Sequence, residues 1–223
     1  MTSSPVHFHR IADWAGFAIF GVWAGLTVSN MPAGGILLAP AFLFEVFVAA
    51  SFLMRDAPKA TTRSLRSRFT AYGGSFVVLI FLQFAGSSHP EWFTPRINAF
   101  TPLAIALWIG GSLWTVWAVY HLRHAFSIEP AARRLVTSGP YRVARHPVYS
   151  GYYAQYLGMW MTFPSLPFLL VLLVWCGMMV DRMYQEEAVL RAAFPEYAAY
   201  ARRVGALGPV FRRRRADRAV VSA

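Results

Sequence analysis

Six apolar segments, separated by polar loops, leave this chain few folds other than a bundle of membrane helices. They cover residues 11–29, 34–54, 70–86, 99–120, 149–163 and 168–180. The first four approach the ~20 residues that a helix needs to cross a ~30 Å hydrocarbon core. With 57% hydrophobic and 14% charged residues, the chain has more apolar surface than one soluble core of this length buries. We therefore predict an all-α, polytopic transmembrane helical bundle with about six membrane segments.

The last two segments are shorter than the others, and two prolines separate them. Pro164 and Pro167 end one helix and start another. Because ~14 residues make only ~21 Å of helix, this pair predicts a C-terminal helical hairpin that dips deep into the bilayer or spans it with its ends outside the hydrocarbon. We divide the chain into an N-terminal region of three spans, residues 1–98, and a second region, residues 99–223, that holds the hairpin and a basic tail.

The basic residues lie almost entirely on one side of the predicted bundle. If the N-terminus is cytoplasmic and all six segments cross, every one of the 21 Lys and Arg residues except Arg96 falls on the cytoplasmic side. This predicts an integral membrane protein with both termini in the cytoplasm. Because the charges sit in short loops between apolar runs, we expect no nucleic-acid partner. The arginines at 212–215 then serve as a topology signal and as an anchor to anionic membrane lipids.

Few residues in the apolar segments suggest metal or acid–base chemistry. Glu45 lies in the middle of the second segment, where a carboxylate is costly and often functional, and the sequence leaves open whether it is paired or protonated. The single cysteine, Cys176, allows no internal disulfide and no Cys-based zinc site. His121 and His124 are three residues apart without a nearby acid on their face, so we expect no metal.

The polar stretch 121–150 is the first candidate for a functional site. The Gly-Pro pair at 139–140 predicts a tight turn that lets the backbone approach a ligand. His146 and Pro147 predict the start of the fifth helix. The free N–H groups of that helix start, beside Arg145, suit an anion such as a carboxylate.

Two tyrosines complete this candidate pocket. Tyr141 and Tyr149 can offer aromatic faces to an adenine ring or to a sulfonium cation. With the anion site beside them, they predict a pocket for a zwitterionic, adenine-bearing cofactor. The chain has no glycine-rich dinucleotide motif after a strand and no phosphate-binding loop, so the pocket is not of a Rossmann or nucleotide-triphosphate type.

A second polar cluster ends the sixth apolar segment. On a helix, Arg182 and Glu186 share a face, and so do Glu187 and Arg191. Solvated ion pairs at a helix end are one interpretation. Because the sixth segment returns to the membrane face that carries residues 121–150, however, we predict that the two clusters meet.

The order of the short motifs resembles a known family. The chain reads Leu-Val-Thr-Ser-Gly-Pro-Tyr at 135–141, Arg-His-Pro-x-Tyr at 145–149, Arg-x-x-x-Glu-Glu-x-x-Leu at 182–190 and Phe-Pro-Glu-Tyr-x-x-Tyr at 194–200. Arranged around a membrane hairpin, these motifs closely resemble the isoprenylcysteine carboxyl methyltransferase family and its phospholipid methyltransferase relatives. Residues 1–98 show no matching motif.

The resemblance implies a methyltransferase core in residues 99–223, with S-adenosylmethionine as cofactor in a cytoplasmic pocket. It also implies a lipophilic or amphipathic methyl acceptor, such as an isoprenylcysteine carboxylate or a lipid. Arg182 would face the acceptor, and Glu186 would contact the cofactor. The other residues that the resemblance places in the cofactor pocket are Leu135, Val136, Tyr141, His146, Pro147, Val148 and Tyr149.

The residues leave the acceptor and two other functions open. A carboxylate acceptor needs no base, whereas an amine, thiol or phenol needs a proton acceptor, for which Glu187 or His146 is available. A non-catalytic lipid-binding protein of the same fold is the first alternative, and the retained motifs argue against it. An NADPH-dependent membrane reductase of related fold is the second, and the short chain argues against it.

Overall fold

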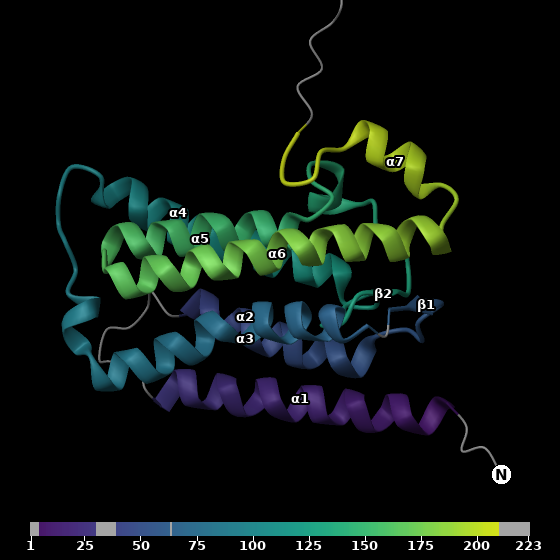
Figure 1. The fold of residues 1–223 in the computed structure, drawn as a ribbon, viewed down its shortest axis with the longest axis horizontal. Coiled ribbons are helices and arrows are strands. Elements are labelled where there is room, and N and C mark those ends of the chain that lie inside the picture. The colour runs from purple at the N-terminus through teal and green to yellow at the C-terminus, as the bar shows by residue number, and fades with distance from the viewer. Residues whose placement is uncertain (1–4, 30–38, 63, 210–223) are drawn as a thin grey trace, which may run out of the picture.

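The computed structural model describes residues 5–29, 39–62 and 64–209, and most of these residues are helical. Each apolar segment forms one helix, and the helices lie side by side in Figure 1. They are α1 (Pro5–Ser29), α2 (Ala39–Met54), α3 (Leu65–Ser88), α4 (Thr101–Leu122), α5 (Pro147–Thr162) and α6 (Leu166–Ala193). The prediction of a helical bundle is confirmed. The basic tail at 212–215 lies outside the described residues.

Three of the described helices, α3, α4 and α6, are long and apolar enough to cross a membrane. α1 and α2 contain shorter apolar stretches, Asp13–Leu26 and Phe42–Met54. α6 is longer than the apolar segment that predicted it, because its 28 residues continue through the second polar cluster. The number of six spans therefore stays a prediction, while helices of membrane-crossing length are present.

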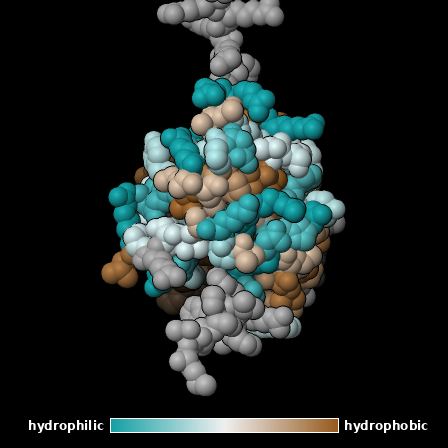
Figure 2. Space-filling model, turned by 90° about the vertical axis from the view of Figure 1, so that its right-hand side faces the viewer, coloured by the Kyte–Doolittle hydropathy of each residue, from teal (hydrophilic) through white to brown (hydrophobic). Residues whose placement is uncertain are grey.

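Short elements gather at the end of the bundle where α5 begins and α6 ends, which we call the motif pole (Figure 1). They are β1 (Ala60–Thr61), β2 (Ala131–Ala132), the 3-10 helix η3 (Gly139–Arg142) and α7 (Tyr197–Arg203). The antiparallel pair β1–β2 departs from the all-α prediction, and strands of two residues are too short to leave a periodic pattern in the sequence. In Figure 2, hydrophilic residues cover much of this pole and hydrophobic residues lie between them. A second 3-10 helix, η2 (Pro90–Phe93), lies between α3 and α4.

The two helices of the predicted hairpin belong to different packed pairs. α5 packs along α4, where a Cβ added to Gly151 would lie only 2.1 Å from Thr115 Oγ1. α6 packs along α3, where the Trp175 indole donates a hydrogen bond of 2.9 Å to the Gly74 carbonyl. α5 and α6 contact each other much less than either contacts its partner. Space for a cavity is therefore available between the two pairs.

Backbone contacts tie the end of α2 to the segment that follows α4. The Asp56 N–H donates to the His124 carbonyl at 2.8 Å, and the Lys59 N–H donates to the Ala132 carbonyl at 2.7 Å. The Arg133 guanidinium donates to the Asp56 carbonyl. Residues from both predicted regions of the chain consequently reach the motif pole.

Candidate functional site

A cavity extends from the motif pole into the middle of the bundle. It runs from Tyr200 of α7 to Tyr156, halfway along α5. Its unfilled space, including the part open to solvent at the mouth, is about 1430 Å³. Helices α2, α3, α5, α6 and α7 and the segment after α4 all contribute to its walls.

Most of the predicted site residues line this cavity. They are Leu135, Val136, Tyr141, Arg145, His146, Val148, Tyr149, Arg182 and Glu186. Among the described residues, Pro147 and Glu187 were predicted for the site but do not form part of the cavity wall. Pro147 is buried in the first turn of α5, and Glu187 lies beside His146. The two polar clusters are in contact, as the path of the sixth segment predicts.

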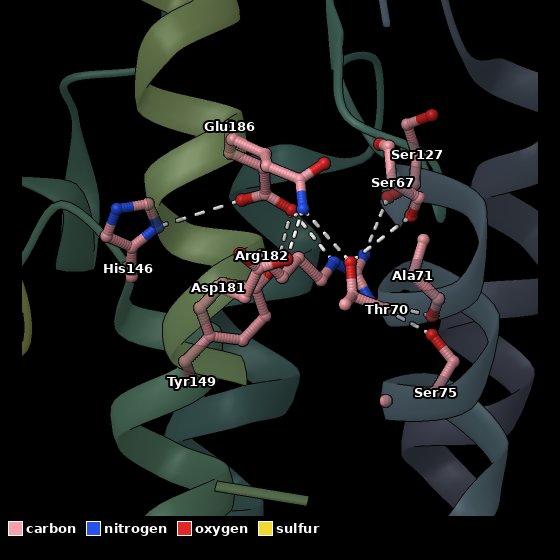
Figure 3. A network of polar contacts seen from close by, with 12 residues as sticks. Ser67, Thr70, Ala71, Ser75, Ser127, His146, Tyr149, Asp181, Arg182 and Glu186 are labelled. Atoms are coloured by element: carbon pink, nitrogen blue, oxygen red, sulfur yellow. Dashed lines mark hydrogen bonds and ion pairs between the residues drawn. The ribbon is translucent and has the colours of Figure 1, made fainter. Parts of the chain in front are cut away.

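Glu186 is the centre of a polar network at the cavity mouth (Figure 3). Its Oε1 accepts hydrogen bonds from the Tyr149 hydroxyl and, at 3.0 Å, from Arg182 Nε. Its Oε2 lies 3.7 Å from His146 Nδ1. The His146 and Tyr149 rings are stacked, with centroids 5.5 Å apart. A carboxylate of α6 therefore contacts both ring residues of the His-Pro-x-Tyr motif.

The Arg182 guanidinium extends from this network toward α3. Its Nη1 donates to Ser75 Oγ at 3.0 Å and to the Ala71 carbonyl at 3.4 Å, and its Nη2 donates to the Ser127 carbonyl at 3.2 Å. Only 7% of Arg182 is exposed. Sequence reasoning missed Ser75 and Ser127, because neither belongs to a recognisable motif.

Glu187 and Arg145 form a second network that holds α7. Arg145 Nε donates to Glu187 Oε1 at 2.8 Å, while its Nη1 donates to the carbonyls of Ala201 and Val204 at 2.9 and 2.7 Å. Glu187 also accepts from Arg191 at 2.9 Å. Both predicted roles, Arg145 as an anion ligand and Glu187 as a base, stay predictions, and their contacts show that each side chain also joins α6 to the C-terminal segment.

Charge and burial set the protonation of the groups at the mouth. Burial by itself would lower the pKa of His146, but the Glu186 and Glu187 carboxylates beside it outweigh burial and raise this pKa. Burial raises the pKa of Tyr141 far above its usual range, and the nearby Glu186 adds to the effect. Burial also raises the pKa of Tyr200 to about 12. The two tyrosines are therefore neutral, and Tyr200 donates a hydrogen bond of 2.7 Å to the Tyr141 carbonyl.

The inner part of the cavity is lined mostly by residues to which the sequence assigned no role in the site. Aromatic rings dominate it: Phe44 packs edge-on against Tyr152, whose ring in turn meets Trp175 at 6.2 Å. Glu45 and Gln155 also line this part. The spacing of residues 149, 152 and 156 places three tyrosines on one helix face, which is the signal that could have found the α5 side. On the α2 side, the mid-span carboxylate of Glu45 is the signal that the sequence offers.

The two histidines considered for metal binding each bond to a backbone carbonyl. His121 Nδ1 lies 3.0 Å from the Trp117 oxygen, and His124 Nδ1 lies 2.8 Å from the Met54 oxygen. Within residues 5–29, 39–62 and 64–209, no group of three or more His, Cys, Asp or Glu side chains is placed to hold a metal ion.

Comparisons with known proteins agree with the motifs. The phospholipid methyltransferase family matches over residues 100–197. The cobalt-zinc-cadmium resistance protein CzcN of Cupriavidus metallidurans is 32% identical over 119 residues, which cover 53% of this chain and 51% of that protein. The chain thus spans about half the length of this curated relative, and no solved structure matches it. Residues 100–197 match the phospholipid methyltransferase family, and the resemblance predicted from the motifs is confirmed over this part of the chain.

Proposed function

We propose that this protein is an integral membrane methyltransferase that uses S-adenosylmethionine and acts on a lipophilic or amphipathic acceptor at the cytoplasmic face. One observation carries the proposal: the Arg-His-Pro-x-Tyr and Arg-x-x-x-Glu-Glu motifs are in contact at the mouth of one cavity. The family match supports methyl transfer, and the long apolar helices support a membrane location.

The residues at the cavity mouth fit the chemistry of S-adenosylmethionine. Glu186 offers a carboxylate to the ammonium group of the methionine part, and Tyr141 and Tyr149 offer aromatic faces to the adenine or the sulfonium. Leu135 and Val136 supply an apolar wall. When bound, the cofactor supplies an electrophilic methyl group on a good leaving centre. The protein then has to align the acceptor with that methyl group for in-line transfer and to exclude water.

Arg182 is the residue that we propose for the acceptor head group. It reaches from Glu186 to Ser75, so it lies where the polar mouth of the cavity gives way to the aromatic inner part. A fixed guanidinium suits a carboxylate or phosphate. For an acceptor that must lose a proton, His146 is the better-placed base because it lines the cavity, and Glu187 acts on it as a positioning residue.

Ligand binding and methyl transfer test the proposal directly. We expect calorimetric titration of the purified protein in detergent to show binding of S-adenosylmethionine and not of NADPH. Glu186→Gln should weaken that binding at least about tenfold, because a charge-assisted hydrogen bond is lost. The control Glu91→Gln changes a glutamate in the exposed helix η2 and should leave the affinity unchanged.

Transfer is measured with a radiolabelled methyl donor, a total membrane lipid extract and a panel of prenylated thiols. Label in the lipid-soluble fraction is the expected result. Binding of NADPH alone would favour a reductase, and binding of neither cofactor would favour a non-catalytic lipid-binding protein. Label confined to water-soluble products would contradict the proposed acceptor class.

A further inference from the structure

The inner end of the cavity is more polar than an apolar tail requires. Glu45 of α2 lines it and is only 3% exposed. Gln155 and Tyr156 of α5 line it as well. A carboxylate, an amide and a phenol therefore border a space whose other walls are aromatic and aliphatic.

This inner polar end lies far from the network at the mouth. Glu45 is nine residues from Met54, the last residue of α2 at the motif pole, and Tyr156 is nine residues from Pro147 at the start of α5. At 1.5 Å per helical residue, both lie ~13 Å into the bundle. The rings of Tyr152 and Trp175 fill part of the wall between the two ends. The cavity thus has a polar mouth, an aromatic middle and a second polar end.

The chemistry of the inner end selects for a hydrogen-bond donor. A hydrocarbon chain end placed against Glu45 and Gln155 would gain nothing from either side chain. A hydroxyl or an ammonium group would hydrogen-bond to the carboxylate and the amide oxygen, and an ammonium would also meet the faces of the neighbouring rings. Burial among apolar and aromatic groups strengthens such a bond, because water does not compete for it.

We propose that the acceptor is an amphiphile with two polar ends, and that Glu45 recognises a hydroxyl or amine at the end remote from the methylated group. The inference rests on the proposed function only where it calls the ligand a methyl acceptor. The binding site itself is inferred from the residues that line the cavity. Glu45 also lies outside residues 100–197, so the family match does not cover the α2 side of this end of the cavity. Glu45 is then a specificity-determining residue that the N-terminal region contributes.

The test compares ligands that differ only at the far end. Straight-chain alkanols, α,ω-diols and amino-alcohols of matched length are titrated into the purified full-length protein, with tryptophan fluorescence as the readout because Trp175 lies in the cavity wall. The native protein should bind the diol or the amino-alcohol at least about tenfold more tightly than the alkanol, the gain expected from one buried charge-assisted bond. Whichever of the diol and the amino-alcohol binds more tightly shows whether the inner end recognises a hydroxyl or an amine.

Variants assign that preference to Glu45. Glu45→Leu should abolish or reverse it, and Glu45→Gln should retain the preference for the diol while losing any extra affinity for the amino-alcohol. Ser51→Ala is the matched control, because Ser51 is a buried polar residue of α2 that donates to the Phe47 carbonyl rather than facing the cavity. Melting temperatures are measured for every variant. If Glu45→Leu does not fold, Glu45→Gln and Gln155→Leu decide the question.

Equal affinities for all three ligands in the native protein, or an unchanged preference in Glu45→Leu, would overturn the inference. If Glu45→Leu does not fold, the overturning result is an unchanged preference in Gln155→Leu together with an undiminished extra affinity for the amino-alcohol in Glu45→Gln. These titrations contain no methyl donor, so their result is independent of the proposed function. A preference without methyl transfer would remove the proposed function and leave the two-ended ligand site. Methyl transfer without a ligand preference would leave the proposed function and remove the two-ended ligand site.

Discussion

Arg182 makes contacts on two sides at once, and this explains why its planar fork matters. Its Nε donates to Glu186 of the same helix, while its two Nη atoms donate to Ser75, the Ala71 carbonyl and the Ser127 carbonyl. The residue thereby fixes the distance between α6 and α3 at the point where the acceptor head group is proposed to bind.

Arg182→Lys keeps the charge but cannot make both sets of contacts. A single ammonium on a flexible stem will leave one or two buried acceptors unpaired, which costs about 1–3 kcal/mol of stability. We expect the KM for the acceptor to rise more than the Kd for the cofactor, measured by the labelled-methyl assay and by calorimetry. Arg191→Lys, at an exposed position of the same helix, serves as the control. Unchanged acceptor kinetics would remove Arg182 from the site.

His146 makes the stability of the protein depend on pH. Because the folded state raises the pKa of this ring above 6.5, the folded protein holds the proton more tightly than the unfolded chain. The stabilisation by Glu186 and Glu187 is complete below a pH of about 6.5 and is lost as the pH rises through the raised pKa. The melting temperatures of the native protein and His146→Asn in detergent should therefore differ most in acid and converge as the pH rises.

A second variant checks the cause of this pH dependence. Glu187→Gln removes one of the two neighbouring charges and should flatten the trend. A difference between native protein and His146→Asn that stays constant with pH would show that the ring is not stabilised by the carboxylates.

At the scale of helices, the α4–α5 pair depends on close backbone approach. A Cβ on Gly111 would lie 2.6 Å from the Gln155 nitrogen and from the Gly151 carbonyl oxygen, and neither backbone atom can move aside cheaply. The adjacent Gly110 has open space around its missing Cβ. The two glycines are neighbours in sequence but face different surroundings.

Alanine substitutions at these glycines provide a matched pair. Gly111→Ala should destabilise the protein by about 1–3 kcal/mol, because it forces α5 away from α4, and it should weaken cofactor binding since α5 carries Tyr149. Gly110→Ala should be neutral or slightly stabilising in the same thermal-unfolding assay. Equal effects of the two substitutions would mean that α4 and α5 do not pack as described.

At the scale of the whole molecule, both described ends of the chain lie toward the same end of the helical bundle (Figure 1). The first residues of α1 and the helix α7 both lie toward the motif pole (Figure 1). The distribution of basic residues predicts that this side is the cytoplasmic one.

Cysteine labelling in intact cells tests this orientation. In a Cys176→Ala background, cysteines introduced at Ser3 and Val220 should stay unlabelled by a membrane-impermeant reagent until the cells are opened. A cysteine at Glu91, in the helix η2 between α3 and α4, should be labelled at once. Labelling of Ser3→Cys or Val220→Cys in intact cells would refute the predicted topology.

The sequence predicted the mouth of the site better than its inner end. His146, Tyr149 and Glu186, which the motifs predict for the site, line one cavity, because the path of the last helices brings the two motifs together. Glu45 and Ser75 could not be assigned, since their role depends on how α2 and α3 pack against a different part of the chain. The hairpin was predicted as one unit, yet each of its helices packs mainly against another helix.

The separation of α5 and α6 into two packed pairs has a mechanical consequence. The pairs α4–α5 and α3–α6 are joined at one end by the short connection around Ser165 and at the other by the hydrogen bonds of Glu186. Between these two joints, the pairs meet through aromatic rings such as those of Tyr152 and Trp175 and border the cavity. Changes in the size of the side chains in this middle part can widen or narrow the cavity without moving either joint. A cavity of this design can be altered to admit ligands of different width while the residues at its mouth keep the same geometry.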